Sequence, residues 1–138
     1  MKKIVILSAI FMGPIVFGTV RPTIGISMSV VTVTAYHPGK GGGCSSPNGT
    51  TASGLKVREG IMAVSRDVEH TLALSFGDNL ILEGMGVFQF QDRMASRCRK
   101  KADVFMSCGQ KARAFGVRRN VLLVKVYPTS PDHLRRSM

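Results

Sequence analysis

Apolar and polar positions alternate with a period of two in several short stretches of the chain, and this pattern predicts β-strands. The first stretch is Ser29–Tyr36, in which β-branched residues dominate. Further short apolar runs lie at residues 61–64, 79–83, 87–91, 104–106 and 121–127. Because the strands are short and closely spaced, we predict a mainly β fold that closes into one small barrel.

Two segments depart from the strand pattern and predict helices. Residues 66–74 predict one or two turns of helix, and residues 108–115 predict a short helix that Gly116 ends as its C-cap. Residues 37–50 separate the first two predicted strands and are rich in glycine, serine and proline, which is typical of a loop. The barrel is therefore expected to carry one or two short helices.

The N-terminal segment has a different composition. Lys2 and Lys3 precede a long apolar run over residues 4–20, which is typical of an export signal. We predict that residues 1–28 form a signal peptide or an N-terminal membrane anchor, that residues 29–127 form the folded domain, and that residues 128–138 form a flexible basic tail. The domain is accordingly expected to be exported to the periplasm or cell envelope, or secreted.

The chain is strongly basic, and this limits the classes of partner. Its 138 residues include 19 Lys and Arg against 8 Asp and Glu, a formal net charge of +11. Such a charge favours anionic partners, which include nucleic acid, anionic lipid and anionic cell-wall polymers. The sequence has no zinc-ligand spacing, basic zipper or aromatic RNA-binding stretch, so we do not expect nucleic-acid binding.

Three cysteines, Cys44, Cys98 and Cys108, occur in the chain. An odd number in an exported protein predicts one disulfide and one free thiol. Each of the three pairings is possible from the sequence, and we favour Cys44–Cys98 because both lie in loops beside the presumed site. There is no Cys-x-x-Cys motif or histidine cluster, so neither a metal nor another cofactor is expected.

Two carboxylates are the strongest candidates for chemistry. Asp92 follows the predicted strand 87–91, and Asp103 precedes the predicted strand 104–106, with a basic loop between them. A carboxylate at the end of a strand can act as a general acid or base. The alternative for each is a purely structural ion pair with a neighbouring Arg or Lys.

These aspartates belong to a longer pattern that resembles the 3D domain, a family named for its three aspartates. The motifs that carry the resemblance are Tyr36, Thr51-Ala52-Ser53-Gly54, Ala63-Val64-Ser65-Arg66-Asp67, Phe76-Gly77, Asp92-Arg93-Met94, Asp103-Val104-Phe105-Met106, Ala112 and Phe115-Gly116-Val117-Arg118-Arg119. The 3D domain is the catalytic barrel of enzymes of the membrane-bound lytic transglycosylase A type, and it is related to the double-psi β-barrel of rare lipoprotein A. The resemblance spans roughly residues 30–127 and implies a six-stranded double-psi barrel.

The resemblance also implies a function and a set of site residues. It implies cleavage of the β-1,4 bond between N-acetylmuramic acid and N-acetylglucosamine in peptidoglycan, without a cofactor and with an anhydromuramic product. Asp103 matches the family's catalytic acid and Asp92 its second aspartate, which we expect to orient Asp103 or to keep it protonated. The residues expected to bind the glycan are Tyr36, Thr51, Ala52, Gly54 and Arg93.

For some of these residues a structural role is the alternative. The Thr51 hydroxyl could bond within its own turn, and Gly54 could be required by the backbone alone. The chain also departs from the family pattern, because Ser65 stands where the first aspartate usually lies, with Asp67 two positions further on. Arg93-Met94 replaces the family's usual Gly-Gly pair, and the sequence has no counterpart of the large second domain that completes the glycan groove. The competing hypothesis is therefore a barrel that binds peptidoglycan without cleaving it.

Overall fold

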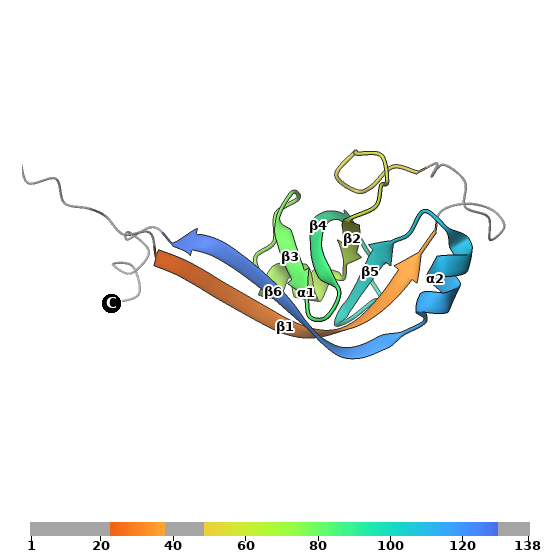
Figure 1. The fold of residues 1–138 in the computed structure, drawn as a ribbon. Helices are drawn as coiled ribbons and strands as arrows, with labels where there is room; N and C mark the ends of the chain where they lie inside the picture. Colours follow the sequence, from red (N-terminus) through yellow and green to blue (C-terminus); the bar gives the residue numbers. More distant parts are fainter. Residues whose placement is uncertain (1–22, 38–48, 130–138) are drawn as a thin grey trace, which may run out of the picture.

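A computed structural model describes residues 23–37 and 49–129 of the chain (Figure 1). The apolar run at residues 4–20, Cys44 and the tail from residue 130 onward lie outside the described residues. In the described part, no helix is both long and apolar enough to cross a bilayer.

Six strands form a closed barrel in the order β1-β5-β2-β4-β3-β6, with β6 pairing back to β1. The strands are β1 (Thr23–Tyr36), β2 (Ile61–Val64), β3 (Asn79–Leu82), β4 (Gly86–Arg93), β5 (Lys101–Phe105) and β6 (Arg118–Thr129). The pairs β1–β5 and β2–β4 are parallel, and the other pairs are antiparallel. This mixed barrel confirms the predicted fold class.

Two short helices accompany the barrel, as predicted. Helix α1 (Arg66–Thr71) follows β2 and buries Val68. Helix α2 (Gly109–Phe115) follows β5 and packs against β1. It ends at Gly116, whose φ of +65° is a backbone conformation that favours glycine.

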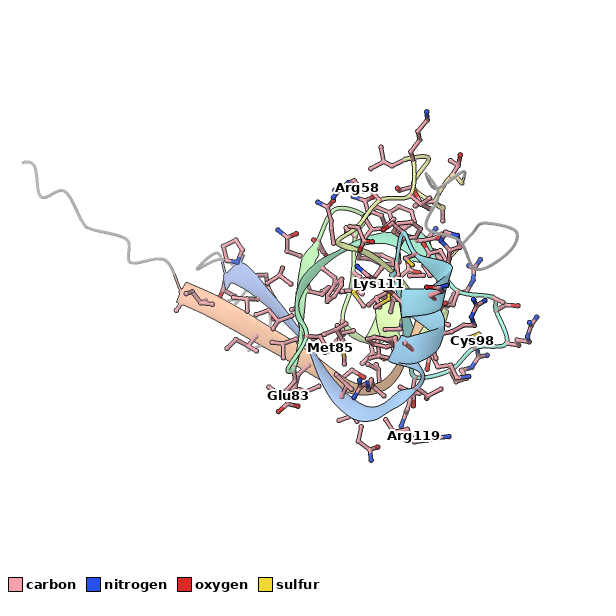
Figure 2. The ribbon with its side chains drawn as sticks, turned by 45° about the vertical axis from the view of Figure 1, so that its right-hand side comes forward. Arg58, Glu83, Met85, Cys98, Lys111 and Arg119 are labelled. Atoms are coloured by element: carbon pink, nitrogen blue, oxygen red, sulfur yellow. The ribbon has the colours of Figure 1, made fainter. Side chains whose placement is uncertain are left out.

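The barrel interior is filled by inward-facing side chains of all six strands. Phe90, Leu80, Leu82 and Leu123 are fully buried there, and Val68 and Leu72 from the α1 region pack against the same cluster. Figure 2 shows side chains filling the barrel, while the labelled Glu83 and Arg119 point away from it. The core therefore follows from the period-two alternation that predicted the strands.

Strand β1 begins at Thr23, earlier than the predicted start at Ser29, and β6 continues to Thr129. Residues 23–31 of β1 pair in antiparallel register with residues 121–129 of β6. The far end of this two-stranded ribbon reaches beyond the barrel on the left of Figure 1. Residues 23–28, which we predicted to be part of the signal or anchor segment, are thus part of a strand.

The bonding of the cysteines in the structure differs from the pairing that we favoured from the sequence. Cys98 is a free thiol, and Cys108 is disulfide-bonded. The Cys44–Cys98 disulfide that we favoured from the sequence is therefore wrong. Cys98 lies in the loop between β4 and β5, whereas Cys108 is buried immediately before α2.

Replacing Phe90 by alanine should destabilise the fold strongly, because the ring is fully buried in the barrel and packs at 5.0 Å from the Phe76 ring. We expect the free energy of unfolding to fall by about 3–5 kcal/mol. Val87→Ala on the same strand is the matched control. It should change the free energy of unfolding by less than about 0.5 kcal/mol, because Val87 is exposed. Urea unfolding of both variants would measure the two changes in stability. Similar losses of stability in the two variants would contradict the placement of Phe90 on the inner face of β4 and of Val87 on its outer face.

Candidate functional site

Strand register places four residues in one row across the outside of the barrel. Ala63 of β2 lies opposite Asp92 on one side and opposite Asp103 on the other. Asp103 in turn lies opposite Thr34 of β1. Because residues opposite each other on paired strands share a face, the two carboxylates point to the same side of the sheet.

A bulge in β4 brings Asp92 into this row. Met62 of β2 pairs with Phe90, but the next residue, Ala63, pairs with Asp92, so that Gln91 is the extra residue. Phe90 is fully buried in the barrel, and simple alternation would place Asp92 on that same inner face. The bulge reverses this and turns the Asp92 side chain outward beside Asp103.

The two aspartates open on one shallow pocket of about 200 Å³. The residues that line this pocket are Tyr36, Ala63, Asp92, Arg93, Met94, Ala95 and Asp103. The structure thus brings together four of the residues singled out from the sequence: Tyr36, Asp92, Arg93 and Asp103. Ala63 lies between the two aspartates along the row, and its methyl group leaves open space there.

Asp103 has the environment of a carboxyl group that can hold a proton. Burial raises its pKa above the ordinary value for aspartate, and the Asp92 carboxylate raises it further. A hydrogen bond of 2.8 Å from the Thr34 hydroxyl to Asp103 Oδ1 acts in the opposite direction, as does the charge of Lys101. The balance is a raised pKa on a group that still lines an open pocket.

Asp92 is held by backbone amides. Its Oδ1 accepts hydrogen bonds from the Ala52 N–H at 2.9 Å and from the Arg93 N–H at 2.8 Å. Its Oδ2 lies 3.5 Å from the Tyr36 hydroxyl. Burial raises the pKa of Tyr36, and the charges of Asp92 and Asp103 raise it further, so the phenol stays protonated and donates a hydrogen bond.

The segment Thr51–Gly54 supports the site mainly through its backbone. The Thr51 hydroxyl is buried in its own turn, where it lies 2.8 Å from Ser53 Oγ and 3.2 Å from the Leu55 amide nitrogen. Thr51 does not line the pocket, and Gly54 has a φ of +87°. These features favour the structural alternatives for both residues, whereas Ala52 contributes the amide that holds Asp92.

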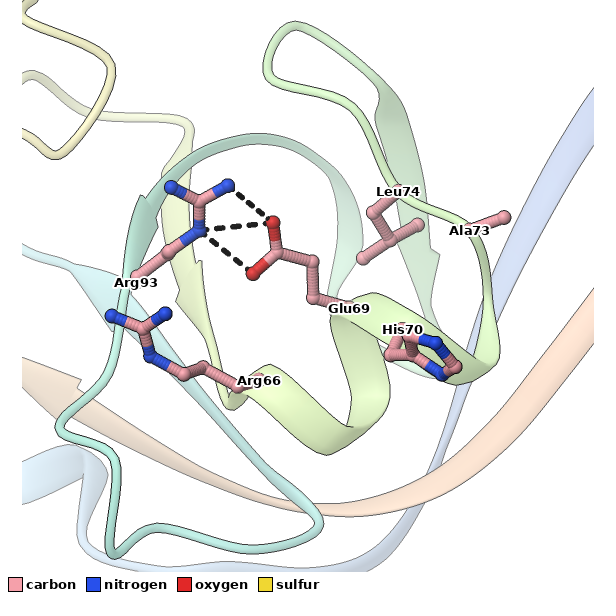
Figure 3. A pocket seen from close by; sticks show the side chains of 6 residues that line it. All are labelled: Arg66, Glu69, His70, Ala73, Leu74 and Arg93. Atoms are coloured by element: carbon pink, nitrogen blue, oxygen red, sulfur yellow. Dashed lines mark hydrogen bonds and ion pairs between the residues drawn. The ribbon is translucent and has the colours of Figure 1, made fainter.

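Arg93 connects the aspartate pocket to a second one. Its guanidinium donates to both carboxylate oxygens of Glu69, with Nε–O distances of 2.9 and 2.8 Å (Figure 3). The same guanidinium lies over the Phe76 ring. The second pocket has a volume of about 570 Å³. It is lined by Arg66, Glu69, His70, Ala73, Leu74 and Arg93. Arg93 is thus fixed in place by an ion pair and a ring contact.

Asp67 has a structural role away from the pocket. Its Oδ2 accepts a 2.8 Å hydrogen bond from the Lys100 amide, and Ser65 Oγ accepts one from the Lys101 amide at 3.0 Å. Although burial opposes the change, hydrogen bonds from Ser65 and from backbone amides lower the pKa of Asp67. Ser65 and Asp67 therefore anchor the end of the basic loop where β5 begins.

Several residues in or beside the site were not among those predicted from the sequence. One is Thr34, which lies two positions before the predicted Tyr36 on the same strand, so that their shared face could have been inferred from alternation. Ala63 and Glu69 carried no such signal, because their importance depends on which strands lie next to each other. In residues 23–37 and 49–129, no group of three or more His, Cys, Asp or Glu side chains is placed to hold a metal ion.

Comparison with known proteins gives structural neighbours only. No protein-family model and no curated protein matches this chain. Among solved structures, it is similar to the apo form of an expansin from Clavibacter michiganensis, with 20% identity and a TM-score of 0.39 over 76% of this chain and 52% of that one. It is also similar to a mutant of that expansin in complex with cellohexaose, with 18% identity and a TM-score of 0.38 over 75% and 51% of the two chains. This chain therefore spans about half the length of either expansin.

The hydrogen bond from Thr34 predicts how the pKa of Asp103 responds to substitution. Thr34→Val removes a donor that favours the carboxylate, so the pKa of Asp103 should rise above its already raised value. NMR titration of the side-chain carboxyl carbon would measure it, with Thr32→Val on the same strand as the control. An unchanged or lowered pKa in Thr34→Val would contradict the described contact.

Proposed function

We propose that this chain cleaves peptidoglycan as a lytic transglycosylase, with the glycan bound across the pocket between Asp92 and Asp103. The observation that carries the proposal is the setting of Asp103: a carboxyl group with a raised pKa that faces an open pocket beside a second carboxylate and a phenol. Perturbed carboxyl groups in pockets are characteristic of catalytic sites. The resemblance to the 3D domain supplies the reaction.

The reaction needs one group that gives and then takes a proton. The Asp103 carboxyl would donate its proton to the glycosidic oxygen as the bond to the anomeric carbon breaks. The C6 hydroxyl of the same muramic acid would then attack the anomeric carbon, and its proton would pass to the Asp103 carboxylate. Because the nucleophile is tethered to the reacting sugar, no second catalytic base is required.

The other residues of the pocket would assist in distinct ways. Asp92 is fixed by two amide donors, so its charge would favour the protonated form of Asp103 and stabilise positive charge that develops on the sugar ring. The protonated Tyr36 hydroxyl would donate to a sugar oxygen or to Asp92. Arg93, held by Glu69, would face the carboxylates of the peptide stems.

A second candidate function is glycan binding without cleavage. Ser65 stands where the family usually has its first aspartate, and its hydroxyl accepts the Lys101 amide rather than lining the pocket. If that aspartate is needed for turnover, the pocket would bind peptidoglycan only. In this case the Asp92 and Asp103 carboxylates would act as hydrogen-bond acceptors for sugar hydroxyl groups.

Asp103→Asn should abolish cleavage while leaving the fold and glycan binding nearly intact. The amide keeps the shape of the side chain but cannot give and retake a proton, so we expect a loss of about 10²–10⁴-fold. Digestion of purified sacculi, with mass analysis of released anhydro-muropeptides, would measure it. Asp92→Asn should reduce the rate of cleavage less than Asp103→Asn does. Asp67→Asn is the matched control, because Asp67 lies outside the pocket.

The same preparation separates the alternatives. Release at the parent rate by Asp103→Asn would contradict the catalytic assignment. Products with ordinary reducing ends would indicate hydrolysis by two carboxylates instead. A parent chain that sediments with sacculi but releases nothing would support the binding function.

The pH dependence of cleavage should follow the protonation of Asp103. The protonated form is needed for donation to the leaving oxygen, so the rate should fall as pH rises through the raised pKa of Asp103. In Thr34→Val this fall should move to higher pH, because the carboxylate loses its hydroxyl donor. A pH–rate profile that is identical in the two proteins would argue against Asp103 as the acid.

A further inference from the structure

The outward face of the β1–β6 ribbon is entirely apolar. The β1 residues on this face alternate along the strand, and each pairs with an apolar residue of β6. The pairs are Ile24–Pro128, Ile26–Val126, Met28–Val124 and Val30–Leu122. The largest exposed side chains on this face are left uncovered, with relative exposures from 47% at Val126 to 69% at Ile24.

The opposite face of the ribbon is more polar and is turned toward the barrel. It carries the pairs Gly25–Tyr127 and Ser27–Lys125. Lys125 reaches the Asp78 carboxylate at 2.8 Å and the Ala73 carbonyl at 2.7 Å, on the segments around α1 and β3. These contacts fix the orientation of the ribbon, so it cannot turn over to bury its apolar face against its own barrel.

This arrangement leaves a contiguous apolar surface without a covering element among the described residues. Alternation of apolar residues with Gly25, Ser27 and Ser29 is the pattern of a strand with one buried face. A two-stranded ribbon with such a face is also only marginally stable in water by itself. Contiguous exposed apolar surface of this kind marks a site of contact with a partner or a membrane.

We propose that the outward face of the ribbon, defined by the four residue pairs above, lies on the lipid surface of an anionic membrane. The chain enters the ribbon at Thr23, directly after the apolar run of residues 4–20 and Arg21-Pro22. It leaves the ribbon at Thr129, and Arg135 and Arg136 follow. An apolar face flanked in sequence by a long apolar run and by cations has the chemistry of an interfacial anchor on anionic lipid.

The absence of tryptophan from the chain allows a direct test, because each introduced tryptophan is the only one. Val126→Trp places the reporter on the outward face of the ribbon. Tyr127→Trp, at the next residue of the same strand, places the reporter on the opposite face. Here tryptophan replaces the tyrosine ring that already occupies this position. The full chain of each variant would be added to vesicles of phosphatidylcholine and phosphatidylglycerol with brominated acyl chains.

Bromine quenches tryptophan only on contact, so the two neighbouring reporters should differ if the ribbon lies on its apolar face. We expect quenching of Val126→Trp to exceed that of Tyr127→Trp by about twofold or more, with a blue shift of its emission on vesicle binding. Vesicles of phosphatidylcholine alone should bind more weakly, because they lack the anionic headgroups. Circular dichroism would establish that both variants keep the fold.

Three results would overturn the proposal. Equal quenching of the two variants, or none, would exclude a lipid-facing role for the outward face. A concentration-dependent blue shift of Val126→Trp without vesicles would show that a second copy of the chain covers the face instead. A third variant combines Ile26→Ser with Met28→Ser. If the outward face is buried in lipid, this double variant should bind vesicles about tenfold or more weakly than the parent chain. An unchanged affinity for vesicles would also count against the proposal.

Discussion

The position of β2 between β4 and β5 is the constraint on which the candidate site depends. Asp92 and Asp103 are on different strands that do not pair with each other, and Ala63 of β2 is in register with both. The bulge at Gln91 then decides on which face Asp92 lies. A one-residue change of register here would move a carboxylate into the apolar core, where its charge is strongly disfavoured.

The two carboxylates of the candidate site lie in different local environments. Burial and the charge of Asp92 raise the pKa of Asp103, whereas two backbone amides hold Oδ1 of Asp92 in place. The Thr51–Gly54 turn contributes to this difference through the Ala52 amide rather than through side chains. Two residues of the same type thereby lie in different surroundings, on which the different roles proposed for them rest.

The strands, the barrel and the two aspartates could be predicted from the sequence because they depend on local alternation and on short motifs. The face of Asp92 does not follow from alternation alone, because a bulge interrupts the pattern that begins at the buried Phe90; the shared groove of the two aspartates was predicted with the help of the resemblance to the 3D domain. The role of Thr51 was uncertain because a hydroxyl group can serve a ligand or its own turn equally well. The disulfide partner of Cys108 depends on distances in space, which cysteine spacing does not fix.

Strand β1 joins the two regions on which the proposed activities rest. Its first residue, Thr23, lies at the far end of the ribbon, and its last residue, Tyr36, lies in the pocket beside Asp92. Fourteen residues of extended strand span at most about 45 Å. If the ribbon rests on a bilayer and the pocket binds peptidoglycan, the length of β1 sets an upper limit on the distance between the pocket and the membrane. Glycan strands close to the membrane would then be within reach, and those in more distant layers would not.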